Sequence, residues 1–153
     1  MASFWYNTAK KEIMDGTIDL LANTIKVMLV TSSYVANADN DVVDAAGAND
    51  PIDHELTGTG YVAGWGGAGR KTLASKTIVV DKPNNRSEFD AADLQWASIN
   101  AGIAAAAIII KEGGANDTTS RLIAYIDTGG FPISTNGGNL DVTWNAEGIL
   151  QLG

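Results

Sequence analysis

The chain contains no cysteine, which excludes disulfide bonds, thiol nucleophiles, iron–sulfur clusters and thiolate zinc sites. Its single histidine, His54, cannot form a zinc site that needs several histidines, and no G-x-S-x-G sequence supplies a serine for a hydrolytic triad. We therefore expect His54 to be a loop or surface residue. We also expect no catalytic residues and no cofactor, and thus a protein that is not an enzyme.

Positive charge is scarce, because 10 Lys and Arg side chains stand against 18 Asp and Glu side chains and leave a net charge of −8. The basic residues are scattered along the chain and form no basic stripe. Since a net-acidic surface repels the phosphate backbone, we expect no nucleic-acid partner.

A long apolar run is also missing. The longest one, residues 101–110, ends at Lys111 and is shorter than the roughly 20 residues that a membrane-spanning helix needs. The first residues lack the charged leader and apolar stretch of a secretory signal. The sequence thus predicts a soluble protein made in a cytosol, with no membrane partner.

Glycine, by contrast, is abundant at 17 of 153 residues, in a chain that is 45% apolar. Glycine weakens helices and suits turns, so this composition favours short strands joined by many turns within one domain. Strand patterns occur at residues 25–31, 55–63, 71–73, 76–80, 87–89, 94–97, 103–111, 121–127, 140–144 and 149–152. They predict a mainly β fold, a single-domain antiparallel β-sandwich or barrel.

The alanine-rich stretch near residue 105 gives conflicting signals. Alanine has the best intrinsic helix propensity, but an isoleucine triplet follows it and leads into a glycine-rich turn. We interpret residues 103–111 as a central strand with small side chains on a crowded face, paired with residues 121–127. A short helix over residues 100–107 is the alternative.

A short N-terminal helix is predicted over residues 3–15, where Ser3 is suited to cap it and Gly16 to end it. We accordingly divide the chain into an N-terminal arm or helix, residues 1–20, and a β-rich domain, residues 21–153.

The stretch GYVAGWGGAGRKTLASKTIVV, residues 60–80, contains two patterns typical of nucleotide binding. Gly64, Gly66 and Gly69 match G-x-G-x-x-G, and residues 64–72 are close to a phosphate-binding P-loop. Both patterns require a following helix, whereas a strand pattern follows here, and Arg70 stands in the place of the P-loop lysine. We interpret the stretch as a flexible loop between strands with Trp65 at its tip.

An acidic polar segment covers residues 36–55. Its carboxylates are Asp39, Asp41, Asp44, Asp50, Asp53 and Glu55. Alternating carboxylates can bind Ca²⁺, but an EF-hand counted from Asp39 fails because Val43 and Asp44 stand where a ligand and a glycine are required. We interpret the segment as a solvated acidic loop and assign no metal ligands, with Ca²⁺ binding as an open alternative.

Two aromatic features indicate contact with a partner. Phe4, Trp5 and Tyr6 are consecutive near the chain start, and such a cluster either packs back on the domain or inserts into a neighbour. Trp65 is flanked by glycines in a loop, unlike the tryptophans that lie in strand patterns and suit a core. We therefore predict Phe4, Trp5, Tyr6 and Trp65 as partner-binding residues.

The order of several phrases resembles a family of small virion structural proteins of tailed bacteriophages. The phrases are TIDLLANTIKVMLVTSSY, ELTGTGYVAG, KTLASKTIVV, FDAADLQWASI, LIAYIDTGG and LDVTWNAEGILQL, which together span nearly the whole chain. The tract from Trp65 to Gly69 does not fit the family's pattern and is interpreted as an insertion.

The resemblance implies a capsid decoration (cement) protein on the virion surface, made in the host bacterial cytoplasm. It also implies the major capsid protein and copies of the chain itself as partners, with a trimer as the expected oligomer. Deleting residues 1–15 is then expected to abolish capsid binding while the domain stays folded. The alternatives are a head–tail junction or tail structural protein, or a carbohydrate-binding module that uses Trp65 and nearby tyrosines.

Overall fold

The computed structural model describes residues 3–153 and shows a mainly β chain with several antiparallel sheets and one short α-helix near the N-terminus, as predicted. The helices are α1 (Asn7–Met14) and a 3-10 helix, η1 (Pro51–His54). The strands are β1 (Phe4–Trp5), β2 (Ile25–Val30), β3 (Lys71–Thr72), β4 (Thr77–Asp81), β5 (Arg86–Asp90), β6 (Leu94–Trp96), β7 (Ile103–Ala104), β8 (Ala106–Lys111), β9 (Arg121–Ile126), β10 (Ile133–Ser134), β11 (Leu140–Val142) and β12 (Leu150–Leu152).

A five-stranded antiparallel sheet in the order β1-β9-β8-β2-β3 forms the centre of the molecule. Its middle strands β2, β8 and β9 are buried on both faces, which explains their continuous runs of aliphatic residues. Ala104, Ala106 and Ala107 have no exposed surface. The prediction of a central strand paired with residues 121–127 is confirmed for residues 106–111, whereas residues 103–104 form the separate strand β7, which pairs with β10. The alternative helix over residues 100–107 is wrong.

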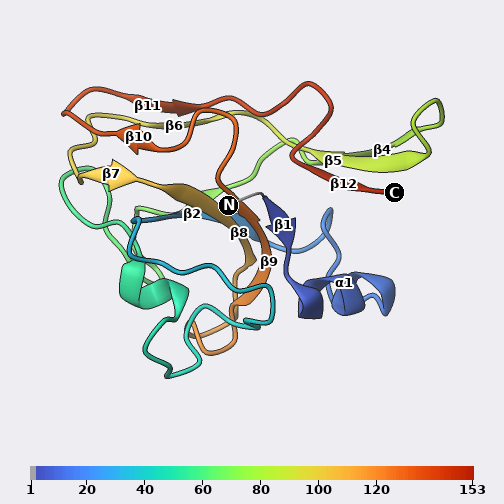
Figure 1. Ribbon diagram of the computed structural model, residues 1–153, viewed down its shortest axis with the longest axis horizontal. Coiled ribbons are helices and arrows are strands. Elements are labelled where there is room, and N and C mark those ends of the chain that lie inside the picture. Colours follow the sequence, from blue (N-terminus) through green and yellow to red (C-terminus); the bar gives the residue numbers. More distant parts are fainter. Residues whose placement is uncertain (1–2) are drawn as a thin grey trace.

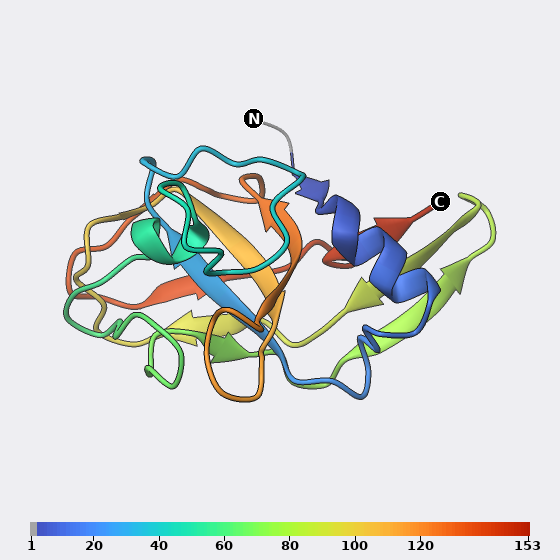
Figure 2. The ribbon, with the colours of Figure 1, turned by 90° about the horizontal axis from the view of Figure 1, so that it is seen from below.

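Two layers cover this sheet and give sandwich-like packing. The small sheets β11–β6 and β10–β7 lie along one side, at the top of Figure 1, and the segment from residue 31 to residue 60, which contains η1, lies on the other. Figure 2 shows that segment and α1 from below, in front of the central strands. Burial on both sides places Trp96, Ile99 and Leu140 in the same core as the central strands.

A fourth, three-stranded sheet, in the order β12-β5-β4, extends from one end of the body beside α1 (Figure 1). The predicted hairpin around Pro83 is confirmed, since β4 and β5 pair from Thr77 opposite Asp90 to Asp81 opposite Arg86. The last strand, β12, pairs with the other edge of β5, so the C-terminus lies next to α1.

The N-terminal segment packs as part of the β-rich body. Tyr6, Ala9 and Ile18 belong to the same core cluster as the central strands. Phe4 and Trp5, predicted within a helix over residues 3–15, instead form β1 at the edge of the sheet, opposite Tyr125 and Ala124. The helix is therefore shorter than predicted, because main-chain pairing with β9 competes for the aromatic residues that precede it.

The predicted strand over residues 55–63 is wrong. Only isolated bridges occur there, between Val30 and Glu55, between Gly58 and Tyr61 and between Thr59 and Asn100. Gly60 has a φ of +80°, which breaks an extended conformation, and a Cβ atom there would lie 2.9 Å from the Cα atom of Ile99. Residues 41–46, within the acidic segment, form bends and one isolated bridge.

Candidate functional site

An apolar cleft lies between α1 and β12. Its lining is Trp5, Lys10, Ile13, Met14 and Leu152, and its volume is about 260 Å³. Met14 is 79% exposed and Leu152 is 54% exposed, although both are large apolar side chains. The sequence explains this exposure locally, since Met14 ends α1 and Leu152 lies on the last strand, both beyond the packed core.

The three-stranded sheet β12-β5-β4 continues this apolar surface away from α1. Leu152 lies opposite Ser87, which in turn lies opposite Val80, so the three side chains form one cross-strand row. Val80 is 68% exposed. Because directly opposed residues point to the same face of a sheet, Val80 and Leu152 share the face on which the cleft opens.

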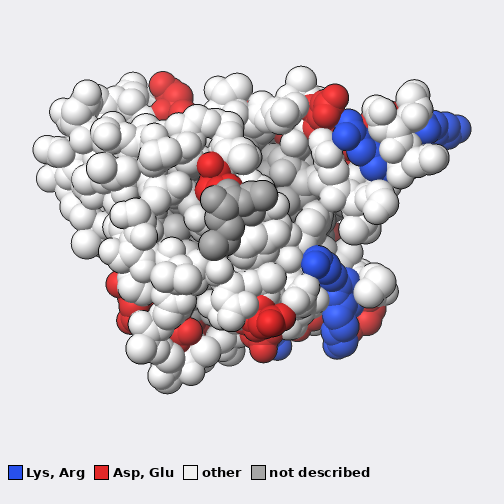
Figure 3. Space-filling view, in the orientation of Figure 1, with Lys and Arg blue, Asp and Glu red and all other residues white. Residues whose placement is uncertain are grey.

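Basic side chains gather at the same end. Figure 3 shows lysine and arginine side chains over α1 and over the β4–β5 hairpin, on either side of a hollow. The Nζ atom of Lys10 is 2.9 Å from the Oδ1 atom of Asn7, to which it donates a hydrogen bond, and Lys11 pairs with Asp15 at 2.6 Å. The cleft is thus an apolar surface with a lysine on its rim, and exposed apolar surfaces with polar rims are common at sites where another molecule docks.

Trp5 is the predicted partner-binding residue that the structure places in this cleft. Its Nε1 atom donates a hydrogen bond to the carbonyl oxygen of Gln151 at 3.1 Å, which ties β1 to β12. The indole also lines a neighbouring groove of about 360 Å³ between β1 and residues 145–151. The Trp5 side chain therefore lines both the α1–β12 cleft and this groove.

Phe4 and Tyr6 instead pack against other aromatic side chains of the domain and stabilise the fold. The Phe4 ring stacks on Tyr125 with a centroid distance of 5.4 Å and meets the edge of Tyr6 at 5.3 Å. Tyr6 has no exposed surface, and its hydroxyl group lies 2.9 Å from that of Tyr34. Burial raises the pKa of Tyr6 far above its ordinary value. Tyr6 is therefore a core residue without a surface for a partner, because its ring fills space between α1 and the sheet.

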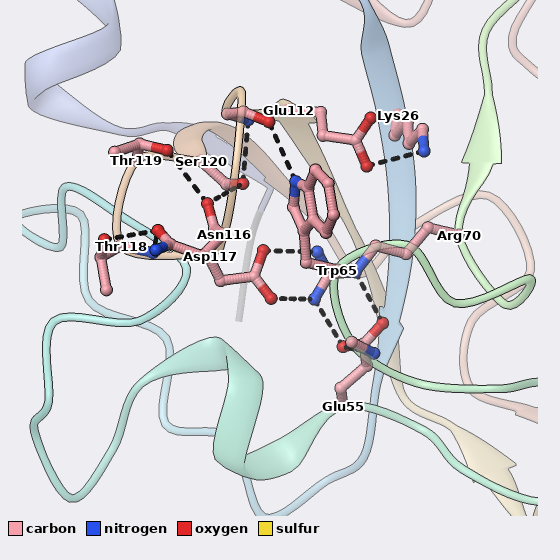
Figure 4. Close-up of polar contacts among 12 residues, drawn as sticks. Lys26, Glu55, Trp65, Arg70, Glu112, Asn116, Asp117, Thr118, Thr119 and Ser120 are labelled. Atoms are coloured by element: carbon pink, nitrogen blue, oxygen red, sulfur yellow. Dashed lines mark hydrogen bonds and ion pairs between the residues drawn. The ribbon is translucent and has the colours of Figure 1, made fainter.

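Trp65 lies elsewhere, at the loops next to residues 112–120, and is 43% exposed. Its Nε1 atom donates a hydrogen bond to the carbonyl oxygen of Gly113 at 2.9 Å, and Figure 4 shows the indole of Trp65 beside the loop of residues 116–120. Trp65 is thus anchored by this hydrogen bond and remains partly open to solvent. The structure does not bring Trp65 together with the Phe4–Tyr6 cluster.

A buried ion triad, Glu55–Arg70–Asp117, anchors the glycine-rich loop that carries Trp65. The Nε and Nη2 atoms of Arg70 donate to Glu55 at 2.8 and 2.6 Å, and its Nη1 and Nη2 atoms donate to Asp117 at 2.7 and 3.0 Å (Figure 4). All three side chains are almost fully buried. Burial alone lowers the pKa of Arg70, but the hydrogen bonds and charges of the two carboxylates raise it overall.

The triad carries one excess negative charge, and neutral donors compensate for it. The Tyr61 hydroxyl donates to Glu55 at 3.0 Å, and the Gly64 main-chain N–H donates to the other oxygen of Glu55 at 2.9 Å. Burial also raises the pKa of Tyr61 well above its ordinary value, which keeps the hydroxyl protonated as a donor. These contacts order the loop around Arg70, which the sequence indicated to be flexible.

The glycines of this loop allow close packing rather than phosphate binding. A Cβ atom on Gly69 would lie 2.4 Å from ring carbons of Tyr61, and Gly64 and Gly66 have φ values of +90° and +75°. The loop leads into β3 and not into a helix, so the nucleotide patterns lack the helix N-terminus that they need. Arg70 occupies the position of the P-loop lysine, but its guanidinium group is already bound to the two carboxylates of the triad.

The acidic segment holds its own backbone with several of its carboxylates. Asp50 accepts hydrogen bonds from the N–H groups of Ala45 and Gly47 at 2.8 and 2.6 Å, and Asp39 and Asp41 accept from Asn7 and Thr8 on α1. Within residues 3–153, no group of three or more His, Asp or Glu side chains has an arrangement that suits a metal ion. His54 is half-buried in η1, near Tyr34, with a ring-centroid distance of 6.1 Å.

Comparisons with known proteins do not add a family, since no family model, no curated protein and no solved structure matches this chain. In the described part of the chain, every helix is too short or too polar to cross a bilayer.

Sequence reasoning missed the α1–β12 cleft and the ion triad. The members of the triad are 15 and 47 residues apart, and nothing local in the sequence distinguishes a buried carboxylate from a solvated one. The cleft joins residues from the two ends of the chain, and only the pairing of β12 with β5 brings them together.

Proposed function

We propose that this chain is a structural protein of a tailed-bacteriophage virion, a capsid decoration protein that binds the outer lattice of the head. The α1–β12 cleft is the observation that carries the docking part of this proposal, because an exposed apolar hollow with a polar rim is typical of a surface that another protein covers. The resemblance of the sequence phrases to small virion proteins supports the virion as the place of docking.

The proposed mechanism is burial of surface against assembled neighbours. An apolar side chain from a lattice subunit enters the cleft and contacts Met14, Leu152 and Trp5, while Lys10 meets acidic groups at the rim. A protein that binds the assembled lattice, but not the free subunit, stabilises the lattice by mass action. No chemical step is required of the bound protein.

The burial of Tyr6 and Ala9 changes the test expected from the sequence. Deleting residues 1–15 removes β1, α1 and two core side chains, so loss of capsid binding by that variant would not separate docking from folding. Point substitutions in the exposed part of the cleft keep the core intact and replace the deletion as the test of docking.

The deciding experiment is quantitative mass spectrometry of separated heads and tails from the phage that encodes the chain. The proposal expects the chain in the head fraction, at a copy number proportional to the major capsid protein. A copy number of one small ring would place it at the head–tail junction, and recovery with tails would make it a tail protein. Absence from purified virions would overturn the virion assignment altogether.

A further inference from the structure

Strand β4 is an unprotected edge of the three-stranded sheet β12-β5-β4. The sheet order β12-β5-β4 leaves one side of β4 without a partner strand among the described residues. Ile78, Val79 and Val80 are 47%, 52% and 68% exposed, and since they alternate in direction, apolar surface is open on both faces. Figure 1 shows β4 and β5 reaching away from the body, so the free edge is accessible. An edge strand of this composition is a template for pairing with another chain.

The direction of the main-chain groups follows from the neighbouring strands. The N–H of Ile149 donates to the carbonyl oxygen of Phe89 at 2.8 Å, so the main chain of Phe89 faces β12. Main-chain polar groups alternate in direction along an antiparallel strand, so Glu88 faces β4 and bonds with Val79, which lies opposite it. The N–H and C=O groups of Ile78 and Val80 therefore point outward, where a further strand can bond with them.

The charges that flank β4 distinguish between possible occupants of this edge. Lys76 precedes the strand and Lys82 follows it, and neither forms an ion pair with a carboxylate within residues 3–153. The Nζ atom of Lys76 donates to the carbonyl oxygen of Asn23. Asp81, at the end of the strand, is already engaged by Arg86 at 3.1 Å and by Asn84 at 2.6 Å. A lysine thus lies at each end of this edge, around an apolar centre; the side chain of Lys82 has no ion-pair partner within residues 3–153, whereas the charge of Lys76 also acts on the Asp19 carboxyl.

A second copy of the chain fits this edge poorly. If β4 pairs antiparallel with itself around Val79, Lys76 of each copy lies opposite Lys82 of the other, and directly opposed like charges are destabilising. Centring the pair on Ile78 or Val80 instead places a lysine opposite an apolar residue. In each symmetric register, the lysines oppose self-pairing, a known way to keep edge strands from associating.

We infer that the edge of β4 binds an extended segment of a different protein, with apolar residues at its centre and an Asp or Glu at each end. The matching sequence is acid-x-apolar-apolar-apolar-x-acid, in which the outer acids lie opposite Lys76 and Lys82. The pattern is the same in both directions, so the segment can pair with β4 in either a parallel or an antiparallel orientation. Main-chain bonds to Ile78 and Val80 supply the affinity, and the lysines supply the selectivity. The inference goes beyond the proposed function, since it does not depend on a virion partner.

The test is an NMR titration of the full chain, up to millimolar peptide, with Glu-Thr-Val-Val-Val-Thr-Glu. The matched control is Lys-Thr-Val-Val-Val-Thr-Lys, which has the same apolar centre. We expect binding of the acidic peptide, with amide shifts and slowed hydrogen exchange centred on Ile78 and Val80, and weaker binding of the basic one. Substituting Lys82→Glu is expected to weaken binding of the acidic peptide about fivefold, because a cross-strand attraction becomes a repulsion. The same substitution is expected to strengthen binding of the basic peptide.

Two further arms keep the outcome independent of any folding defect. Methylating the peptide nitrogens that face β4 should abolish binding, whereas methylating those on the opposite edge should not. Equal binding of the two peptides, no binding of either, or shifts confined to Met14 and Trp5 would each overturn the inference. Concentration-dependent dimerisation through β4, seen by sedimentation, would also overturn it. None of these results bears on whether the chain occurs in virions.

Discussion

At the scale of single residues, Arg70 determines the conformation of the loop that carries Trp65. Its guanidinium group makes two hydrogen bonds to Glu55 and two to Asp117, and through them connects three segments that lie far apart in the sequence. Removing one partner of a buried ion pair leaves charge without compensation in a region of low polarity, which costs far more than losing a surface pair.

Arg70→Ala is expected to lower the free energy of unfolding by about 3–5 kcal/mol, because the carboxylates of Glu55 and Asp117 would remain buried without a cation. The matched control is Arg86→Ala, which removes an arginine that pairs with Asp81, Glu88 and Glu147 at the surface. Urea unfolding followed by tryptophan fluorescence measures both. Equal losses in the two variants would contradict a special role for the buried triad.

Gly69→Ala tests whether the glycine-rich loop is shaped by packing. The added methyl group would lie 2.4 Å from the Tyr61 ring, so we expect a loss of about 1–3 kcal/mol in the free energy of unfolding, the range typical of overpacking. Gly114→Ala, in the nearby loop, has no atom within 4 Å of the added carbon and serves as the control. A neutral Gly69→Ala would mean that the loop moves away from Tyr61 at little cost.

At the scale of elements, α1 has two opposed roles. Ala9 and Glu12 are buried on its inner side, where Glu12 lies 3.3 Å from Arg121 on β9. Ile13 and Met14 end the helix at the cleft, where Met14 remains largely exposed. The inner side anchors the helix to the sheet, and its last turn is therefore available for docking without any rearrangement.

Met14→Glu is expected to weaken binding to heads that lack the chain on the order of tenfold or more, because it places a charge in a surface that docking must desolvate. Stability should change little, since Met14 is 79% exposed. The control is Val35→Glu, which alters an apolar side chain that is 64% exposed and does not line the cleft. Co-sedimentation with heads measures binding, and normal decoration by Met14→Glu would exclude the cleft as the docking surface.

At the scale of the whole molecule, all four tyrosines belong to one core, and each has a raised pKa that is due first to burial. In the unfolded chain these hydroxyls lose their protons near pH 10, whereas in the folded chain they keep them. Above that pH the unfolded state therefore binds fewer protons than the folded state. Stability must then fall as pH rises, and it is fully present below pH of about 10.

We accordingly expect the midpoint of urea unfolding to drop steeply above about pH 10, with tyrosinate absorbance rising only as the chain unfolds. Tyr6→Phe should make the decline less steep, because one buried ionisable group is removed, although the contact with the Tyr34 hydroxyl is lost as well. Tyrosinate absorbance that rises fully before the loss of structure would contradict the burial of these residues.

The charge distribution is also a property of the whole chain. Residues 27–69 contain no Lys or Arg and six of the acidic residues, whereas the other segments hold all 10 basic residues. The acidic stretch covers one side of the central sheet, and lysines flank the cleft and β4 at the other end (Figures 1 and 3). Outside residues 27–69, the other 12 acidic side chains still outnumber the 10 basic ones, so only the local lysines at the cleft and at β4 suit acidic groups of a partner.

The sequence by itself determined the β-rich class, the central strands and the β4–β5 hairpin. These depend on signals local to a few residues: aliphatic runs at β2, β8 and β9, and turn residues around Pro83. It also determined that the nucleotide patterns near Gly64 lack their helix. Local backbone preference and the hydrophobic pattern suffice for such statements, because their physical causes act within one segment.

Only the tertiary structure determined which individual side chains are buried, exposed or paired. It buried Tyr6, left Met14 exposed, joined Glu55 and Asp117 to Arg70, and exposed the edge of β4. Each of these outcomes depends on contacts between segments far apart in the chain, or on which strand lies last in a sheet. Burial and edge position are properties of the assembled layers, so no short stretch of sequence contains them.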